Sequence, residues 1–246
     1  MMAGKGLGTI KYNTVETSPM NSQKEKYLAF YNYYVERGKR IATTLETLDY
    51  LTTHEQEYTT ISTISPAFIT AVINNFWMQA IIELDAFYYV KNDLSFNKFF
   101  NYIKSNWNLI FTKEFFEEIH YSNCVEKRQI KFTKKKIFDT VTECENIIEQ
   151  NKSDIENLRN LRNNVAAHFA DISSNKLTIS LDQLIKVFQI TEQIINKIGV
   201  FYDRVAISLK PINAGDIYQT CHALNMYIKY RDYIIKAENN LLGQNK

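Results

Sequence analysis

The chain has 246 residues, of which 45% are hydrophobic, and its formal net charge is +2. Such a composition supplies enough apolar side chains for a sizeable core, and so small a net charge excludes nucleic-acid binding by overall charge alone. Only 7 glycines and 3 prolines are present. Because chain breakers are so few, the sequence favours long helices over a sheet with many tight turns.

Three cysteines, Cys124, Cys144 and Cys221, are odd in number and far apart. They do not form a disulfide framework, which indicates a reducing compartment. We find neither an uninterrupted apolar run of about 18 residues nor an apolar signal region near the first residue. We therefore expect a cytoplasmic protein without a membrane partner. Residues 1–21 are expected to form a mobile N-terminal segment ahead of a single domain, 22–246.

Apolar residues recur with a period near 3.6, which predicts a series of amphipathic helices. The first extends from Ser22 to Leu51, and Gly38 is a point at which it bends or is interrupted. Pro66 begins a second helix that reaches Val90; it is the most apolar and should be central and buried. Further helices are expected at Asp93 or Ser95 to Ile110, from Thr112, at Lys134–Gln150, Ser153–Phe169, Ser180–Val205 and Ala214–Asn239.

Three of these helices begin with a capping pattern. Thr133 precedes one helix, and Ser153 and Ser180 each stand three positions before a Glu or Gln, as in a capping box. Internal repeats and a linker that would separate two domains are both absent. The sequence predicts one all-α domain, a helical bundle in which the tyrosine and phenylalanine stripes form the core.

A carboxylate, Asp85, lies inside the most apolar helix. If it is buried, it needs a cationic partner, for which Arg159 or Arg162 are suitable. The alternative is a partly exposed aspartate on the helix surface.

The greatest density of polar chemistry is in the segment Arg159 to Asp171, RNLRNNVAAHFAD. The guanidinium of Arg162 matches the geometry of phosphate oxygens, and His168 can take up and return a proton near neutral pH. At about 100° per residue, these two side chains lie roughly 120° apart around one helix. A straight helix cannot direct both at one atom, so a complete site requires a bend or a second copy of the chain in a symmetric dimer.

The RNNVAAH segment resembles the signature of the HEPN superfamily, in which an arginine and a polar residue are followed by a histidine. The longer LRNLRNNVAAHFAD segment resembles the abortive-infection AbiU-like branch. The apolar stretch from Phe76-Trp77 to Asp85 and the LSFNKF segment that follows it also resemble this branch. The resemblance covers about Pro66 to Val205.

This resemblance implies a HEPN-like bundle with additional flanking helices, dimeric through the Ser153–Phe169 helix. It also implies a metal-independent endoribonuclease used in phage defence or in a toxin system, without a cofactor, and with an antitoxin or other defence protein as a further partner. His168 would move the proton of the ribose 2′-OH or of the leaving oxygen. Arg162 would stabilise charge on the phosphate, and Asn163 would orient one of them. The product would be a 2′,3′-cyclic phosphate.

The candidate substrate-binding residues are Arg159 and Asn164, beside the motif, and Lys131, Lys134, Lys135 and Lys136, in a basic run that extends from Lys127 to Lys136. The run would follow an RNA backbone; the alternative is a solvated loop and helix face. His120 and Cys124 share a helix face, but two ligands do not make a zinc site. Two other functions fit the sequence: a non-catalytic interaction or RNA-binding module of the same family, and a helical scaffold with no nucleic-acid role.

Overall fold

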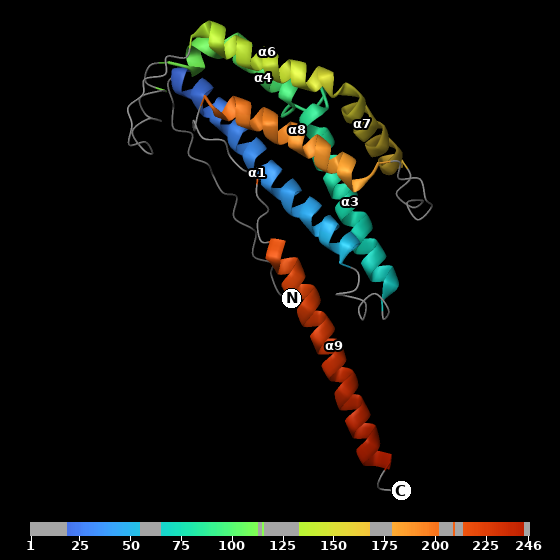
Figure 1. Ribbon diagram of the computed structural model, residues 1–246. Coiled ribbons are helices and arrows are strands. Elements are labelled where there is room, and N and C mark those ends of the chain that lie inside the picture. Colours follow the sequence, from blue (N-terminus) through green and yellow to red (C-terminus); the bar gives the residue numbers. More distant parts are fainter. Residues whose placement is uncertain are drawn as a thin grey trace, which may run out of the picture.

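The computed structural model of the chain consists of helices (Figure 1). It describes residues 19–54, 65–112, 115, 133–167, 179–201, 209 and 214–243. Within these residues there are seven helices and no strand, so the all-α prediction is confirmed. The helices are α1 (Pro19–Thr53), α3 (Pro66–Tyr88), α4 (Phe96–Ile110), α6 (Lys134–Gln150), α7 (Lys152–Ala167), α8 (Leu181–Gly199) and α9 (Ala214–Gly243).

Helix α1 lies at the centre of the packing and contacts α3, α4, α8 and the first part of α9. It starts at Pro19, three residues before the predicted Ser22, and it passes through Gly38 without a break. Residues 1–18 of the expected mobile segment lie outside the described residues. The predicted apolar positions of α1 are buried; they include Tyr27, Phe30, Tyr31, Tyr34, Ile41, Leu45 and Leu48.

Aromatic rings form much of the core between α1 and α4. The ring of Tyr34 lies 5.0 Å from that of Phe96 and 5.3 Å from that of Phe99, between centroids. The tyrosine hydroxyls are satisfied by carbonyl groups: Tyr27 donates to Ile198 at 3.1 Å and Tyr34 donates to Ser95 at 3.2 Å. Burial raises the pKa of both hydroxyls well above the usual value. The prediction that these aromatic stripes are core is confirmed.

Helix α3 is only half buried, which corrects the prediction of a fully central helix. Its buried residues begin at Met78, whereas Phe68 near its start is 57% exposed. Among the described residues, the first turns of α3 meet a small satellite cluster with the end of α1 and part of α9, and contact with the main core begins at Ile73, Phe76 and Trp77. By length and composition alone, α3 is also long and apolar enough to cross a membrane, although its second half is a core helix here.

The predicted caps have mixed outcomes: Thr112 accepts the N–H of Phe115 as a cap would, whereas Ser95 precedes α4 without a side-chain capping hydrogen bond. Thr133 accepts the Lys136 N–H at the start of α6, and Ser180 forms a complete capping box with Gln183 at the start of α8. The predicted box at Ser153 is wrong. The carbonyl of Asn151 accepts the first backbone hydrogen bond of α7, from Ile155, so Ser153 already lies inside the helix.

Close packing of α8 on α1 explains a glycine at the end of α8. A Cβ at Gly199 would lie 2.5 Å from the Tyr31 hydroxyl oxygen and 3.1 Å from two ring carbons. We expect Gly199→Ala to lower the free energy of unfolding by about 1–3 kcal/mol, because the buried Tyr31 ring has little room to move. Chemical denaturation of the purified variant measures this loss.

The matched control is Gly38→Ala in α1. There a Cβ would lie 2.5 Å from a terminal methyl of Leu209. Leu209 is also buried, but a terminal methyl can move by rotation about a single bond, whereas the Tyr31 ring has to move as a rigid group. Alanine also favours the helix by up to about 1 kcal/mol relative to glycine. The Gly38 variant should therefore be close to the wild type in stability, and equal losses in the two variants would contradict the explanation.

Candidate functional site

Helix α7 carries four of the predicted site residues. Arg159 and Arg162 are partly exposed on the side that faces α3, and Asn163 is exposed. Asn164 lies in the same helix, but its side chain is outside what the structure describes. The helix ends at Ala167, and His168 also falls outside the described residues. The convergence of Arg162 and His168 therefore stays a prediction.

The two arginines of α7 share a buried carboxylate from α3. Asp85 is only 2% exposed; its Oδ1 lies 3.3 Å from the Nε of Arg159, and its Oδ2 lies 3.8 Å from the Nε of Arg162. The predicted pairing of Asp85 is confirmed with both candidate partners, and the alternative of a partly exposed aspartate is wrong. A buried carboxylate without such partners would be strongly destabilising.

A tyrosine completes the cluster. The guanidinium carbons of Arg159 and Arg162 lie 5.5 Å and 5.0 Å from the centroid of the Tyr89 ring, which is cation–π geometry. Tyr89 caps the end of α3, where its N–H donates to the carbonyl of Asp85. Our sequence analysis did not single out Tyr89. Its position four residues after Asp85 could have indicated it, because such residues share a helix face.

The cluster keeps one positive charge and part of its surface open. Two guanidinium groups face one carboxylate, and the side chains of Arg159 and Arg162 are 29% and 33% exposed. Asp85 contacts each guanidinium at Nε rather than at the terminal nitrogens. The Nη1 of Arg162 donates instead to the Oδ1 of Asn163, at 3.3 Å. The Arg162 guanidinium is thus held at Nε and Nη1 in a side chain that is one-third exposed, and such a guanidinium is suited to bind a phosphate.

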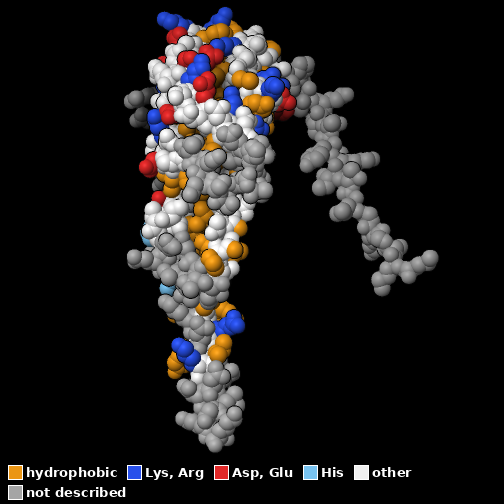
Figure 2. Space-filling model, turned by 90° about the vertical axis from the view of Figure 1, so that its right-hand side faces the viewer, with side chains coloured by type: hydrophobic (Ala, Val, Ile, Leu, Met, Phe, Trp, Pro, Cys, Tyr) orange, Lys and Arg blue, Asp and Glu red, His pale blue; other side chains and the backbone are white. Residues whose placement is uncertain are grey.

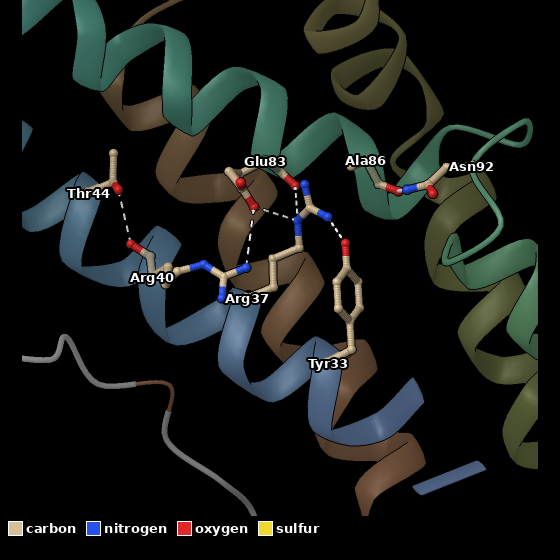
Figure 3. A network of polar contacts seen from close by, with 7 residues as sticks. All are labelled: Tyr33, Arg37, Arg40, Thr44, Glu83, Ala86 and Asn92. Atoms are coloured by element: carbon tan, nitrogen blue, oxygen red, sulfur yellow. Dashed lines mark hydrogen bonds and ion pairs between the residues drawn. The ribbon is translucent and has the colours of Figure 1, made fainter. Parts of the chain in front are cut away.

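A second arginine pair on the other side of α3 shows a contrasting arrangement (Figure 3). From α1, Arg37 contacts the Oε2 of Glu83 at 2.6 Å and donates to the Glu83 carbonyl at 3.1 Å, while Arg40 lies 4.0 Å from the same Oε2. Arg37 also donates to the hydroxyl of Tyr33. Burial lowers the pKa of Arg37, and Glu83 counteracts part of this shift.

The two clusters have the same composition but differ in how much of their arginine side chains is exposed to solvent. Each uses a carboxylate of α3 and two arginines three residues apart on a neighbouring helix, which are neighbours on one helix face. Arg37 is 9% exposed and its nitrogens are used within the core, so we assign the Glu83 cluster to stability. The Asp85 cluster is open and is the candidate functional site.

The basic run lies in another part of the molecule. Lys134, Lys135 and Lys136 are exposed in the first turn of α6, and Lys131 is outside the described residues. The ammonium of Lys134 lies over the rings of Trp107 and Phe138. At 1.5 Å per residue, α6 separates these lysines from the start of α7 by about 25 Å. The structure does not bring them together with the arginine cluster.

The outward face of α7 is polar. Ile155, Leu158 and Leu161 face the core, whereas the exposed positions are polar or charged; they are Lys152, Ser153, Glu156, Asn157, Asn160 and Asn163. A dimer through α7 would therefore have a hydrated interface of amide groups. Among the described residues, no three His, Cys, Asp or Glu side chains come together in a metal-binding group. His120 and Cys124 lie outside them.

We compared the chain with protein-family models, with curated proteins and with solved structures, and it matches none of them. The HEPN resemblance therefore depends on the RNNVAAH motif and on the sequence segments around it.

Proposed function

We propose that the chain is a metal-independent endoribonuclease with a HEPN-like helical core, acting in phage defence or in a toxin system. One observation supports this proposal above the others. The arginine of the RNNVAAH motif, Arg162, lies partly exposed over a buried carboxylate and beside a polar residue of the same motif. An arginine held in this way is oriented before its ligand arrives, which is what electrostatic stabilisation of a transition state requires.

Each motif residue has a role in a cleavage in which RNA supplies its own nucleophile. The ribose 2′-OH attacks the adjacent phosphorus, and the bond to the 5′-oxygen of the next nucleotide breaks. His168 removes the 2′ proton or supplies one to the leaving oxygen. Arg162 stabilises the negative charge that develops on the phosphate oxygens. The products are a 2′,3′-cyclic phosphate and a 5′-hydroxyl, so no metal-bound water is needed.

Asn163 and Asp85 serve this chemistry by positioning Arg162. The Asn163 amide oxygen accepts from Nη1 and the Asp85 carboxylate lies beside Nε, so two edges of the guanidinium are fixed by neighbours from α7 and α3. Arg159 shares Asp85 and adds a second cation for the substrate phosphate. Because Arg162 and His168 are about 120° apart on their helix, the complete site is composed of residues from two chains.

Cleavage of RNA by the purified protein in EDTA tests the proposal. We expect a 5′-labelled single-stranded RNA to yield fragments that end in a 2′,3′-cyclic phosphate. Such fragments resist 3′-end ligation until the cyclic phosphate is removed. The absence of cleavage over a range of RNA substrates would contradict the proposal.

A second candidate function is a non-catalytic RNA-binding or interaction module. One observation favours it. Because Asp85 neutralises one of the two arginine charges, only one positive charge of the cluster is available to a phosphate. Salt-dependent RNA binding without cleavage would support this second candidate. The proposed partners are RNA, a second copy of the chain and, in a toxin system, an antitoxin.

A further inference from the structure

Helix α9 extends well beyond the body of the molecule. Its 30 residues correspond to about 45 Å of helix. Near its start, Cys221 and Ile228 pack on a small cluster with the end of α1 and the first half of α3; that cluster includes Leu51, Ile69, Val72 and Phe76. Among the described side chains of α9, Ile228 is the last in the cluster, and the helix continues to Gly243. Figure 1 shows α9 projecting away from the other helices.

The projecting helix exposes large apolar side chains. Met226, Tyr227, Tyr230 and Tyr233 are 54%, 68%, 67% and 71% exposed. Their spacing of three and four residues places them on one side of the helix, roughly opposite the side that carries Cys221. Figure 2 shows hydrophobic side chains along this projecting part of the molecule. A helix with contacts on one side only over half its length gains little stability from packing and requires another partner.

The charges of α9 argue against a polyanionic partner. Its sequence contains three basic and three acidic residues, which are Lys229, Arg231, Lys236, Asp216, Asp232 and Glu238. A surface that binds RNA or an anionic membrane has an excess of Lys and Arg. A helix with no net charge can approach its own copy without repulsion, and neutrality favours association.

The exposed area is sufficient for a specific pair of helices. An aromatic side chain buries about 150–250 Å² when fully covered. The three tyrosines are each about two-thirds exposed. Together with Met226 they therefore offer roughly 500 Å² of surface that can be buried per chain, or about 1,000 Å² in a symmetric pair. This is the lower limit for a specific interface. The phenol hydroxyls can stay hydrated at its rim, as tyrosines at interfaces do.

We propose that α9 is a dimerisation helix whose Met226, Tyr227, Tyr230 and Tyr233 face packs on the same face of α9 from a second copy, in antiparallel orientation. A two-fold axis near Tyr230 makes the contact isologous and closed. Because the body of each chain lies at one end of α9, an antiparallel pair places the two bodies at opposite ends, where they do not collide. This interface is separate from α7 and does not depend on the ribonuclease proposal.

The mass of the full-length chain in solution tests this inference. At tens of micromolar, light scattering after gel filtration should give at least twice the chain mass of 28.8 kDa, and a larger multiple if the separate α7 contact also forms. The double variant Tyr230→Glu, Tyr233→Glu should raise the dissociation constant of the α9 contact at least about 100-fold, because buried tyrosines are typical hot spots. It should halve the mass of the wild-type assembly, to a monomer if α9 makes the only contact and to a dimer if α7 also pairs. Its core helices should remain folded by circular dichroism, since both side chains are exposed, while its melting temperature should fall with the loss of the dimer.

The control is Leu109→Glu in α4, an exposed apolar residue at 39% that should leave the dimer intact. A second measurement does not depend on the stability of the double variant: under copper–phenanthroline oxidation, Tyr230→Cys should give a covalent dimer, and Leu109→Cys should not. A monomeric wild type, an assembly whose mass the double substitution does not lower, or sedimentation of the wild type with anionic vesicles would each overturn the inference.

Discussion

Replacement of Arg162 or His168 by alanine is expected to lower the rate of RNA cleavage at least about 100-fold, because each removes a group that acts only in the transition state. The fold should persist. The Arg162 side chain is one-third exposed, and without it Asp85 keeps Arg159 as a partner. The expected loss of unfolding free energy in Arg162→Ala is therefore about 1 kcal/mol or less. Cleavage of labelled RNA in EDTA and thermal melting by circular dichroism measure the two effects.

Arg40→Ala is the matched control for charge. Arg40 is also a partly exposed arginine beside a carboxylate of α3, but it belongs to the Glu83 cluster. This variant should cleave RNA like the wild type. Equal cleavage by the wild type and His168→Ala would contradict the catalytic assignment, and loss of helicity in both motif variants would indicate a structural role for the motif.

Mixing the two inactive variants tests whether the site is shared between chains. If Arg162 of one chain acts with His168 of another, a mixed dimer contains one intact site and one site that lacks both residues. After subunit exchange at equal amounts, about a quarter of wild-type activity should return, since half of the dimers are mixed and each has one of two sites. A site within one chain would give no recovery.

Features that depend on local chemistry were predictable from the sequence. Thr133 and Ser180 cap their helices as expected because capping involves only residues within one turn. The pairing of Asp85 was predictable for another reason. A carboxylate in the most apolar helix must find a cation, and the arginines of the motif segment offered one.

Features that depend on how two helices meet or pack were not predictable. The start of α7 was misplaced because Asn151 serves both helices. Its N–H and its side-chain amide donate to carbonyls at the end of α6, and its own carbonyl accepts the first hydrogen bond of α7. No capping pattern in the sequence encodes this. Whether α3 is buried along its whole length depends on which other helices pack on it. The spacing of apolar residues within α3 does not contain that information. Glu83 was missed because a glutamate can extend to solvent, so its pairing with Arg37 becomes evident only when α1 is placed beside α3.

The Glu83 cluster yields the largest expected effect on stability. Arg37→Met should lower the free energy of unfolding by about 3 kcal/mol, because it leaves the Glu83 carboxylate, 25% exposed, without its 2.6 Å partner. The substitution also removes the hydrogen bond to Tyr33 within α1 and the cation over the Phe87 ring of α3. Urea denaturation at neutral pH measures the loss.

The comparison with Arg40→Ala decides whether this loss comes from the buried pair or from charge in general. Arg40 is 52% exposed and lies 4.0 Å from the same Glu83 oxygen, so its removal should cost at most about 1 kcal/mol. The double variant Arg37→Met, Glu83→Leu should recover much of the stability lost in Arg37→Met, since it removes the stranded carboxylate together with its partner. If Arg37→Met and Arg40→Ala are equally destabilising, burial of the Arg37–Glu83 pair is not what joins α1 to α3.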